Sequence, residues 1–185
     1  MSNSALWEKE EVIEAIILQH KKFKETITAL DQKTFDFSWE GKWTPGQQLE
    51  HIKKSVAPVV LAFRLPRFML KYQFGVTNRP SRSYYALVAR YLKALDGKTA
   101  VAPKQFQPPP VPFKTRQKQF KAYEKVVQKF VKLAQKCPEK DLDYYVLPHP
   151  LIGKLTLREI LFFCLYHVQH HHQITKEIIR NSSTN

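Results

Sequence analysis

His167 and His171 lie four residues apart in the most apolar stretch of this chain, residues 160–174. On a helix, side chains at positions i and i+4 project from the same face, one turn apart. Two imidazoles at this spacing can bind one metal ion, as in the helical His-x-x-x-His motif of zinc proteases. A third protein ligand would complete a site with an open coordination position. The first question is therefore whether the chain supplies that ligand.

A helix with a well-defined start carries the candidate third ligand, His51. In residues 43–47, Thr44 is the predicted N-cap, Pro45 takes the first helical position and Gln47 completes a capping box. His51 follows about two turns later, at the edge of the core-facing stripe. If this helix lies beside the last one, three neutral imidazoles would meet and leave positions for water or substrate. Zinc, nickel and iron all accept such ligands.

The remaining histidines have other predicted positions. His170 and His172 project elsewhere on the last helix and are interpreted as surface groups or as neighbours of the site. His149, between two prolines, is a candidate for the mouth of a pocket. His20, between polar residues, is expected to face solvent. The spacing alone also fits core histidines that are hydrogen-bonded to tyrosine or to backbone carbonyls, so at this point both interpretations stand.

Motifs for other kinds of catalysis are missing from the sequence. There is no nucleophile elbow, phosphate loop or dinucleotide fingerprint, and the five glycines are too scattered to hold a phosphate. No pair of carboxylates shares the histidine strips. Glu50 and Glu159 are candidate hydrogen-bond acceptors for the imidazole N–H groups. The chemistry of the chain therefore depends on its histidines.

The composition is that of a globular protein. Of the 185 residues, 43% are hydrophobic and 25% are charged, which allows a sizeable core. We assign residues 1–180 to a single domain and residues 181–185 to a disordered tail. Cys137 and Cys164 do not make a disulfide framework, and Cys164 lies in the apolar run, as expected of a reduced core residue.

The chain is strongly basic, with a formal net charge of +14 from 30 Lys and Arg against 16 Asp and Glu. Such an excess raises nucleic acid as a partner. However, the basic residues are spread along the chain without a run of five or six. One predicted helix carries a lysine stripe, which is interpreted as a solvated outer face, with anion binding as the alternative. The stripe consists of Lys121, Lys125, Lys129, Lys132 and Lys136.

Helical periodicity dominates the chain and predicts an all-α four-helix bundle with a long crossover and an extra short helix. The long helices are expected near residues 5–30, from 45 onward, 115–136 and 156–180, and the short one at 83–95. Pro58, Pro66 or both should kink or break the second long helix, because an internal proline removes a backbone hydrogen bond. The proline-rich residues 98–113 and residues 141–153 are predicted loops.

The chain shows no targeting or membrane-spanning signal. Residues 1–11 are polar and acidic, without the apolar core of a signal peptide. No apolar run approaches the roughly 20 residues that a membrane-spanning helix needs. We therefore expect a cytoplasmic protein with no membrane partner.

Two segments resemble motifs of the DinB-like superfamily. The segment Trp43-Thr-Pro-Gly-Gln-Gln-Leu-Glu-His51 is similar to the second-helix motif of the family, in which a tryptophan and a small capping residue precede a ligand histidine. Residues 149–174, ending in Tyr166-His-Val-Gln-His-His-His-Gln-Ile174, resemble its last block, which has two ligand histidines separated by three residues. The resemblance covers most of the chain in helix order.

The resemblance implies a four-helix bundle that holds a divalent metal by three histidines. Position by position, these are His51, His167 and His171. Family members include S-transferases and a maleylpyruvate isomerase that use low-molecular-weight thiols such as bacillithiol, mycothiol or glutathione. It therefore also implies a thiol and a small electrophile as partners, and a homodimer.

Four functions are weighed on these grounds. The first is a metal-dependent thiol S-transferase that acts on a small electrophile. The second, its nearest variant, is metal-assisted hydrolysis. A metal-binding module without catalysis is the third. A basic nucleic-acid-binding protein is the fourth and least favoured, because it depends on the lysine stripe alone.

Overall fold

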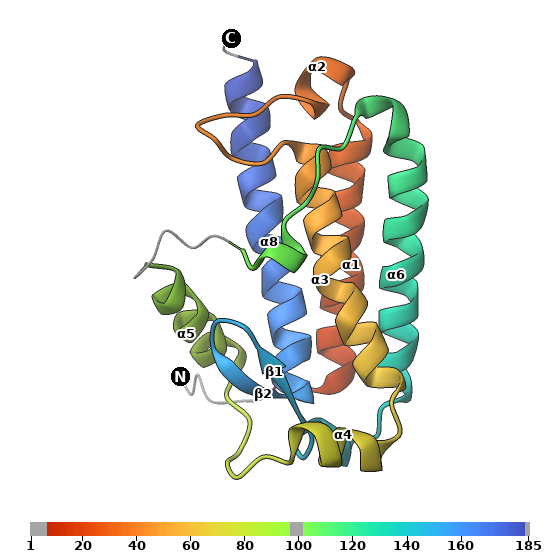
Figure 1. The fold of residues 1–185 in the computed structure, drawn as a ribbon, viewed down its shortest axis with the longest axis vertical. Helices are drawn as coiled ribbons and strands as arrows, with labels where there is room; N and C mark the ends of the chain where they lie inside the picture. Colours follow the sequence, from red (N-terminus) through yellow and green to blue (C-terminus); the bar gives the residue numbers. More distant parts are fainter. Residues whose placement is uncertain (1–6, 97–101, 184–185) are drawn as a thin grey trace.

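Four long helices form the bundle in the computed structural model, which describes residues 7–96 and 102–183 (Figure 1). These are α1 (Lys9–Thr28), α3 (Pro45–Arg64), α6 (Arg116–Lys136) and α8 (Leu157–Ser182). Helices α1 and α3 each pack against both α6 and α8. The predicted all-α bundle is therefore confirmed. Helix α1 begins at Lys9, about four residues after the predicted start, and α8 ends at Ser182, two residues after the predicted end.

Apolar stripes hold the helices together, and α8 is the most deeply packed. Its residues 160–166 are apolar on every side, and Leu161, Phe162 and Leu165 are completely buried. Phe23 of α1 and Phe130 of α6 are also completely buried in the same core. Burying this much apolar surface is the main favourable term in folding.

Both predicted capping boxes are present, and they begin the two helices that carry the histidines. The Thr44 hydroxyl accepts a hydrogen bond from the Gln47 N–H (3.2 Å), and the Gln47 side chain accepts one from the Thr44 N–H (3.1 Å). Thr156 and Glu159 make the same reciprocal pair at the start of α8, at 3.2 and 3.0 Å. These bonds satisfy N–H groups that would otherwise be unpaired.

Helices α3 and α6 run in the same direction along the bundle (Figure 1). The chain must therefore return along the bundle between them, and it does so through a long crossover. It contains α4 (Arg67–Phe74), the predicted short helix α5 (Tyr84–Asp96) and two single-turn 3₁₀ helices, η1 (Lys104–Phe106) and η2 (Phe113–Thr115). Helix α3 continues through Pro58 and ends before Pro66. Of the two predicted interruptions, only the one at Pro66 breaks the helix.

Sequence reasoning missed a small β-hairpin between α6 and α8. Residues 141–153 were predicted to be a loop, but β1 (Val146–His149) pairs antiparallel with β2 (Gly153–Thr156). Four-residue strands are too short to show a clear alternating pattern, and a proline in β1 hides the signal further. Two further short helices lie in the connections. Helix α2 (Gln32–Phe35) precedes α3, and α7 (Glu139–Leu142) precedes the hairpin.

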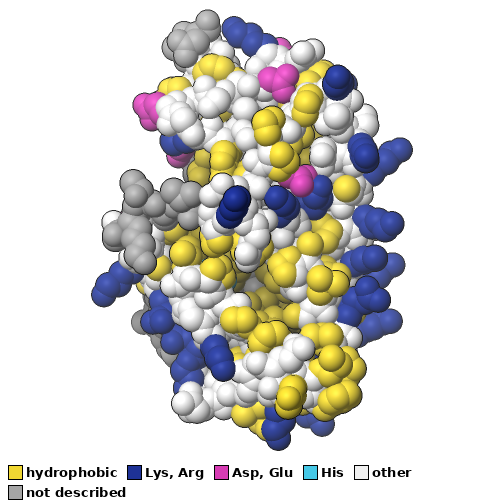
Figure 2. All heavy atoms as spheres, in the orientation of Figure 1, with side chains coloured by type: hydrophobic (Ala, Val, Ile, Leu, Met, Phe, Trp, Pro, Cys, Tyr) yellow, Lys and Arg dark blue, Asp and Glu magenta, His cyan; other side chains and the backbone are white. Residues whose placement is uncertain are grey.

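The surface matches the charge pattern expected from the sequence. All five residues of the lysine stripe on α6 are exposed, and Figure 2 shows a row of basic side chains along that edge of the molecule. In the part of the chain that the structure describes, none of the helices combines the length and apolar character needed to cross a membrane.

Candidate metal centre

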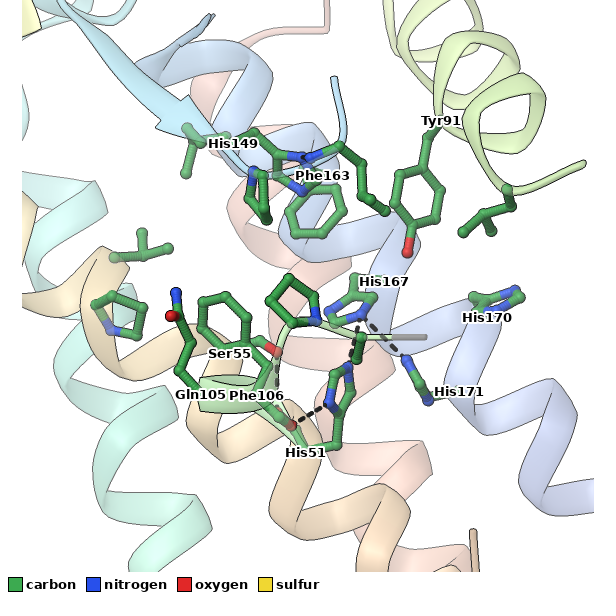
Figure 3. Close-up of a pocket in the computed structure, with 18 of the residues that line it drawn as sticks. His51, Ser55, Tyr91, Gln105, Phe106, His149, Phe163, His167, His170 and His171 are labelled. Carbon is green, nitrogen blue, oxygen red and sulfur yellow. Dashed lines mark hydrogen bonds between the residues drawn. The ribbon is translucent and has the colours of Figure 1, made fainter. Parts of the chain in front are cut away.

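Three histidines from two neighbouring helices converge inside the bundle. Nε2 of His167 lies 3.2 Å from Nε2 of His51 and 3.0 Å from Nε2 of His171. All three residues are buried, and each offers a nitrogen within 4.8 Å of the others. Figure 3 shows the three rings pointing toward one another, His51 from α3 and the other two from α8. The structure thus brings together the residues that the spacing and the resemblance singled out.

Hydrogen bonds on the outer nitrogens orient two of the rings. Nδ1 of His51 lies 2.8 Å from the carbonyl oxygen of Phe106 in η1. Nδ1 of His171 lies 2.5 Å from Oε1 of Gln48, one turn before His51 on α3. Because both partners are acceptors, each Nδ1 carries the proton. Both Nε2 atoms therefore present lone pairs toward His167.

The cluster has too few protons to satisfy itself. Burial lowers the pKa of His167 and His171 well below the usual value, and repulsion from the neighbouring imidazoles adds to it. Each ring is therefore neutral near pH 7 and carries one N–H. Nε2 of His167 carries at most one proton, so at least one Nε2 lone pair in the cluster has no donor of its own. A cation at the centre would satisfy these lone pairs.

The spacing also suits a metal ion. In a tetrahedral site with metal–nitrogen distances of about 2.0–2.1 Å, neighbouring nitrogens lie about 3.3–3.4 Å apart. The two Nε2 separations of 3.0 and 3.2 Å are close to this value. Neutral imidazoles are good ligands for zinc, nickel and iron. Three protein ligands leave at least one coordination position open, which distinguishes catalytic from structural sites.

A cavity of about 670 Å³ opens beside the three imidazoles. Most of its wall is apolar and comes from α3, α5, α8, the β1–β2 hairpin and the segment around η1. Lys42 is the one Lys, Arg, Asp or Glu among the described residues that line it. This volume lies within the range of sites for small molecules and cofactors.

A family model described as the DinB superfamily matches residues 16–175. The chain belongs to the DinB superfamily. The predicted resemblance is therefore confirmed, and the match includes the three converging histidines.

The structure of YfiT from Bacillus subtilis is similar to this DinB-superfamily chain. YfiT is described as "a probable metal-dependent hydrolase with an unusual four-helix bundle topology". The two share 16% sequence identity with a TM-score of 0.62, over 98% of this chain and 92% of the other. At this identity the likeness establishes the fold alone. No protein in the search of curated proteins matches the sequence.

His149 and His170 both line the cavity. The His149 ring packs on Phe163 with 4.3 Å between centroids, across the cavity from the three histidines (Figure 3). Its Nδ1 accepts a hydrogen bond from the Leu151 N–H (3.2 Å), so the neutral ring carries its proton on Nε2. Burial lowers the pKa of His149 to about 4 and keeps it neutral at physiological pH. It is thus a fixed hydrogen-bond donor.

Tyr91 of α5 is a cavity residue that sequence reasoning missed. Its hydroxyl points toward the histidines in Figure 3, and its ring lies 6.5 Å from that of His167. Burial raises the pKa of Tyr91 to about 12, so the hydroxyl keeps its proton at neutral pH. No sequence signal identified it, because α5 belongs to the crossover and reaches the site only through tertiary packing.

Two histidines lie in a different part of the core. His20 was expected to face solvent, but it is only 2% exposed, and its Nδ1 lies 2.6 Å from the hydroxyl of Tyr123 on α6. His172 is buried as well, with its Nε2 2.8 Å from the Thr26 hydroxyl of α1. The prediction for His20 was wrong because the polar residues beside it face solvent while position 20 falls on the buried stripe of α1.

The two candidate carboxylates do not support the imidazoles. Glu159 is completely buried and accepts hydrogen bonds from Arg79 at 2.7 and 2.8 Å. Glu50 forms an ion pair with Lys53. The acceptors for the imidazole N–H groups are instead the Gln48 amide and the Phe106 carbonyl. Gln48 shares a helix strip with His51, so a sequence signal for it existed, whereas the carbonyl had none.

Proposed function

We propose that His51, His167 and His171 hold a divalent metal ion and that the protein is a metal-dependent thiol S-transferase acting on a small electrophile. The observation that carries this proposal is the convergence of three Nε2 atoms at the wall of a mainly apolar cavity. Zinc, nickel and iron all suit this donor set.

The protein would orient the metal ligands and exclude water from the site. The Phe106 carbonyl and the Gln48 amide hold two imidazoles in the tautomer that binds metal. When bound, a divalent ion supplies Lewis-acid chemistry and lowers the pKa of a thiol or water that reaches its open side. The Nε2–H of His149 and the hydroxyl of Tyr91 can donate hydrogen bonds to an electrophile in the cavity. The apolar wall excludes competing water.

The composition of the cavity favours a thiol over water as the nucleophile. A free thiol has a pKa of about 8.5, so a modest lowering produces the thiolate near neutral pH, whereas water starts near 15.7. A metal-activated thiol also needs no carboxylate base, and the described lining contains none. The thiolate would attack the electrophilic carbon, forming a C–S bond, and the leaving group would depart with the bonding electron pair.

Hydrolysis is the second candidate, and the described activity of YfiT favours it. The same open centre would then activate water in place of a thiol. The choice between the two nucleophiles is a choice of co-substrate, so one set of assays with and without thiol decides it.

Metal analysis tests the centre directly. Untagged protein purified without chelator should carry close to one divalent ion per chain, and His51→Ala should lose it because two imidazoles bind far more weakly than three. His170→Ala is the matched control, since His170 lines the same cavity outside the cluster. Equal metal content in wild type and His51→Ala, at matched folding by circular dichroism, would contradict the three-histidine centre.

Activity assays then test the reaction. The metal-loaded protein should consume a low-molecular-weight thiol in the presence of an activated aryl halide, and chelation should abolish the reaction. Turnover of a nitrophenyl ester without thiol would instead support hydrolysis. A fully loaded protein that catalyses neither reaction would contradict the enzyme proposal and favour a non-catalytic metal-binding module.

A further inference from the structure

Large apolar side chains project into solvent at one end of the bundle, where α3 ends and α4 begins. Leu61 is 62% exposed, Phe68 is 74% exposed and Tyr72 is 92% exposed. Two exposed basic residues, Arg64 and Lys71, stand between them in the sequence. We call these five residues the end patch. They do not belong to the metal centre or its cavity.

The end patch exists because α4 is amphipathic and packs by one side only. Leu70 on the inner side is completely buried, and α4 contacts β1. Phe68, Lys71 and Tyr72 follow spacings of three and four residues, which places them together on the outer side. Only two residues separate α3 from α4, so Leu61 and Arg64, which are exposed in the last turn of α3, lie near the start of α4.

The two basic residues of the end patch are not paired with carboxylates. In the described parts of the chain, no carboxylate lies within ion-pair distance of Arg64 or Lys71. Asp141, which lies beside α4, is already bound to Arg67 (2.8 Å). On the face shown in Figure 2, basic and apolar side chains lie together at the end of the molecule that carries α4. The end patch therefore attracts an anionic partner.

A second copy of this chain fits the end patch poorly. A symmetric dimer would place the same basic residues against each other, and each chain has a formal net charge of +14. The apolar side chains also project into solvent, and Tyr72 is almost fully exposed. Protruding aromatic and leucine side chains with basic neighbours are typical of helices that lie in the interface of a lipid bilayer.

We propose that the end patch binds the surface of an anionic lipid bilayer. Leu61, Phe68 and Tyr72 would enter the headgroup region, and Arg64 and Lys71 would contact the anionic headgroups. Such binding is peripheral and needs no membrane-spanning helix. It revises the expectation of no membrane partner, which depended only on the missing apolar run. It is independent of the proposed function of the histidines.

Vesicle co-sedimentation tests the end patch. The full chain should bind vesicles of phosphatidylcholine mixed with phosphatidylglycerol, should not bind phosphatidylcholine alone, and should be released by high salt. Phe68→Ser/Tyr72→Ser should lower the partition coefficient by about tenfold or more, because the apolar contribution is lost. Ile17→Ser/Leu18→Ser is the matched control, since these residues of α1 are also partly exposed.

A second comparison separates the end patch from net charge. Arg64→Glu/Lys71→Glu should weaken binding more than Lys125→Glu/Lys129→Glu, which changes the charge equally on α6. Equal losses in the two pairs, or no binding of the wild type to anionic vesicles at low salt, would overturn the proposal. A dimer that Phe68→Ser/Tyr72→Ser converts to a monomer, without vesicle binding by the wild type, would assign the end patch to a second copy. Melting temperatures confirm that each variant is folded.

Discussion

At the scale of single residues, two hydrogen bonds determine what the three histidines can bind. Without them, the rings of His51 and His171 could turn or change tautomer, and the Nε2 lone pairs would no longer converge. Gln48 is the more informative of the two partners, because its side chain can be replaced, whereas the Phe106 carbonyl belongs to the backbone. The Gln48 side chain is almost fully buried and also donates to the Trp43 carbonyl (3.2 Å).

Replacing Gln48 should weaken metal binding without removing a ligand. Gln48→Leu keeps the size of the side chain but removes the acceptor for His171 Nδ1. We expect metal affinity to fall about 10- to 100-fold, the usual effect of losing a hydrogen-bond partner of a ligand. Competition with a chromophoric chelator measures this. Ser55→Ala is the control, since Ser55 bonds only the backbone carbonyl of His51. Unchanged affinity in Gln48→Leu would show that this bond does not orient the ligand.

At the scale of elements, the start of α3 is the critical junction, because it positions both His51 and Gln48. The Thr44 cap begins the helix, and the next turn packs against α2. A β-carbon built at Gly46 would lie 2.5 Å from Cε1 and 2.7 Å from Cζ of Phe35. Phe35 is completely buried, so it has little room to move. Glycine at this position permits the close approach of the two helices.

Gly46→Ala should therefore destabilise the protein, although the same change usually stabilises a helix by about 0.5–1 kcal/mol. Overpacking of this kind costs about 1–3 kcal/mol. Urea denaturation followed by circular dichroism should show a lower midpoint, and metal affinity should fall with it. Thr44→Ala, which removes the cap and adds no atoms, should cost about 1 kcal/mol and serves as the comparison. Equal or greater stability of Gly46→Ala would contradict this account.

At the scale of the whole molecule, packing the bundle buries titratable groups that do not belong to the metal centre. Burial lowers the pKa of His20 to about 3, against a usual value near 6.5. Above pH 6.5 the ring is neutral in both the folded and the unfolded chain, and its contribution to stability is complete. Between pH 6.5 and 3 the unfolded chain binds a proton that the folded chain does not. Stability therefore falls as the pH falls through this range.

The free energy of unfolding of the protein, measured after metal has been removed with a chelator, should decrease below pH 6.5. His20 should contribute up to about 1.4 kcal/mol per pH unit to this decrease. His20→Gln should show a shallower decrease. Tyr123→Phe removes the hydrogen bond but keeps the titrating ring, so its slope should stay like that of the wild type. Urea denaturation at a series of pH values measures the three slopes. Identical slopes for His20→Gln and wild type would mean that His20 is not buried as a neutral group.

The sequence predicted those features that depend on neighbouring residues. Both capping boxes, the break at Pro66 and the positions of the long helices follow from interactions within a few residues. The i, i+4 spacing of His167 and His171 places both on one face of α8 wherever that helix packs. The capped helix offered His51 as the third histidine, the family motifs supported it, and the structure brings all three together.

Only the tertiary structure decided how these histidines are oriented and what surrounds them. The acceptor for His51 is a carbonyl 55 residues away in the crossover, and Gln48 bonds a ring 123 residues later. The cavity, the burial of His20 and the end patch depend equally on which faces of distant helices meet. Local patterns determine which face of a helix is apolar, but not which partner covers it, because that choice depends on the packing of the whole chain.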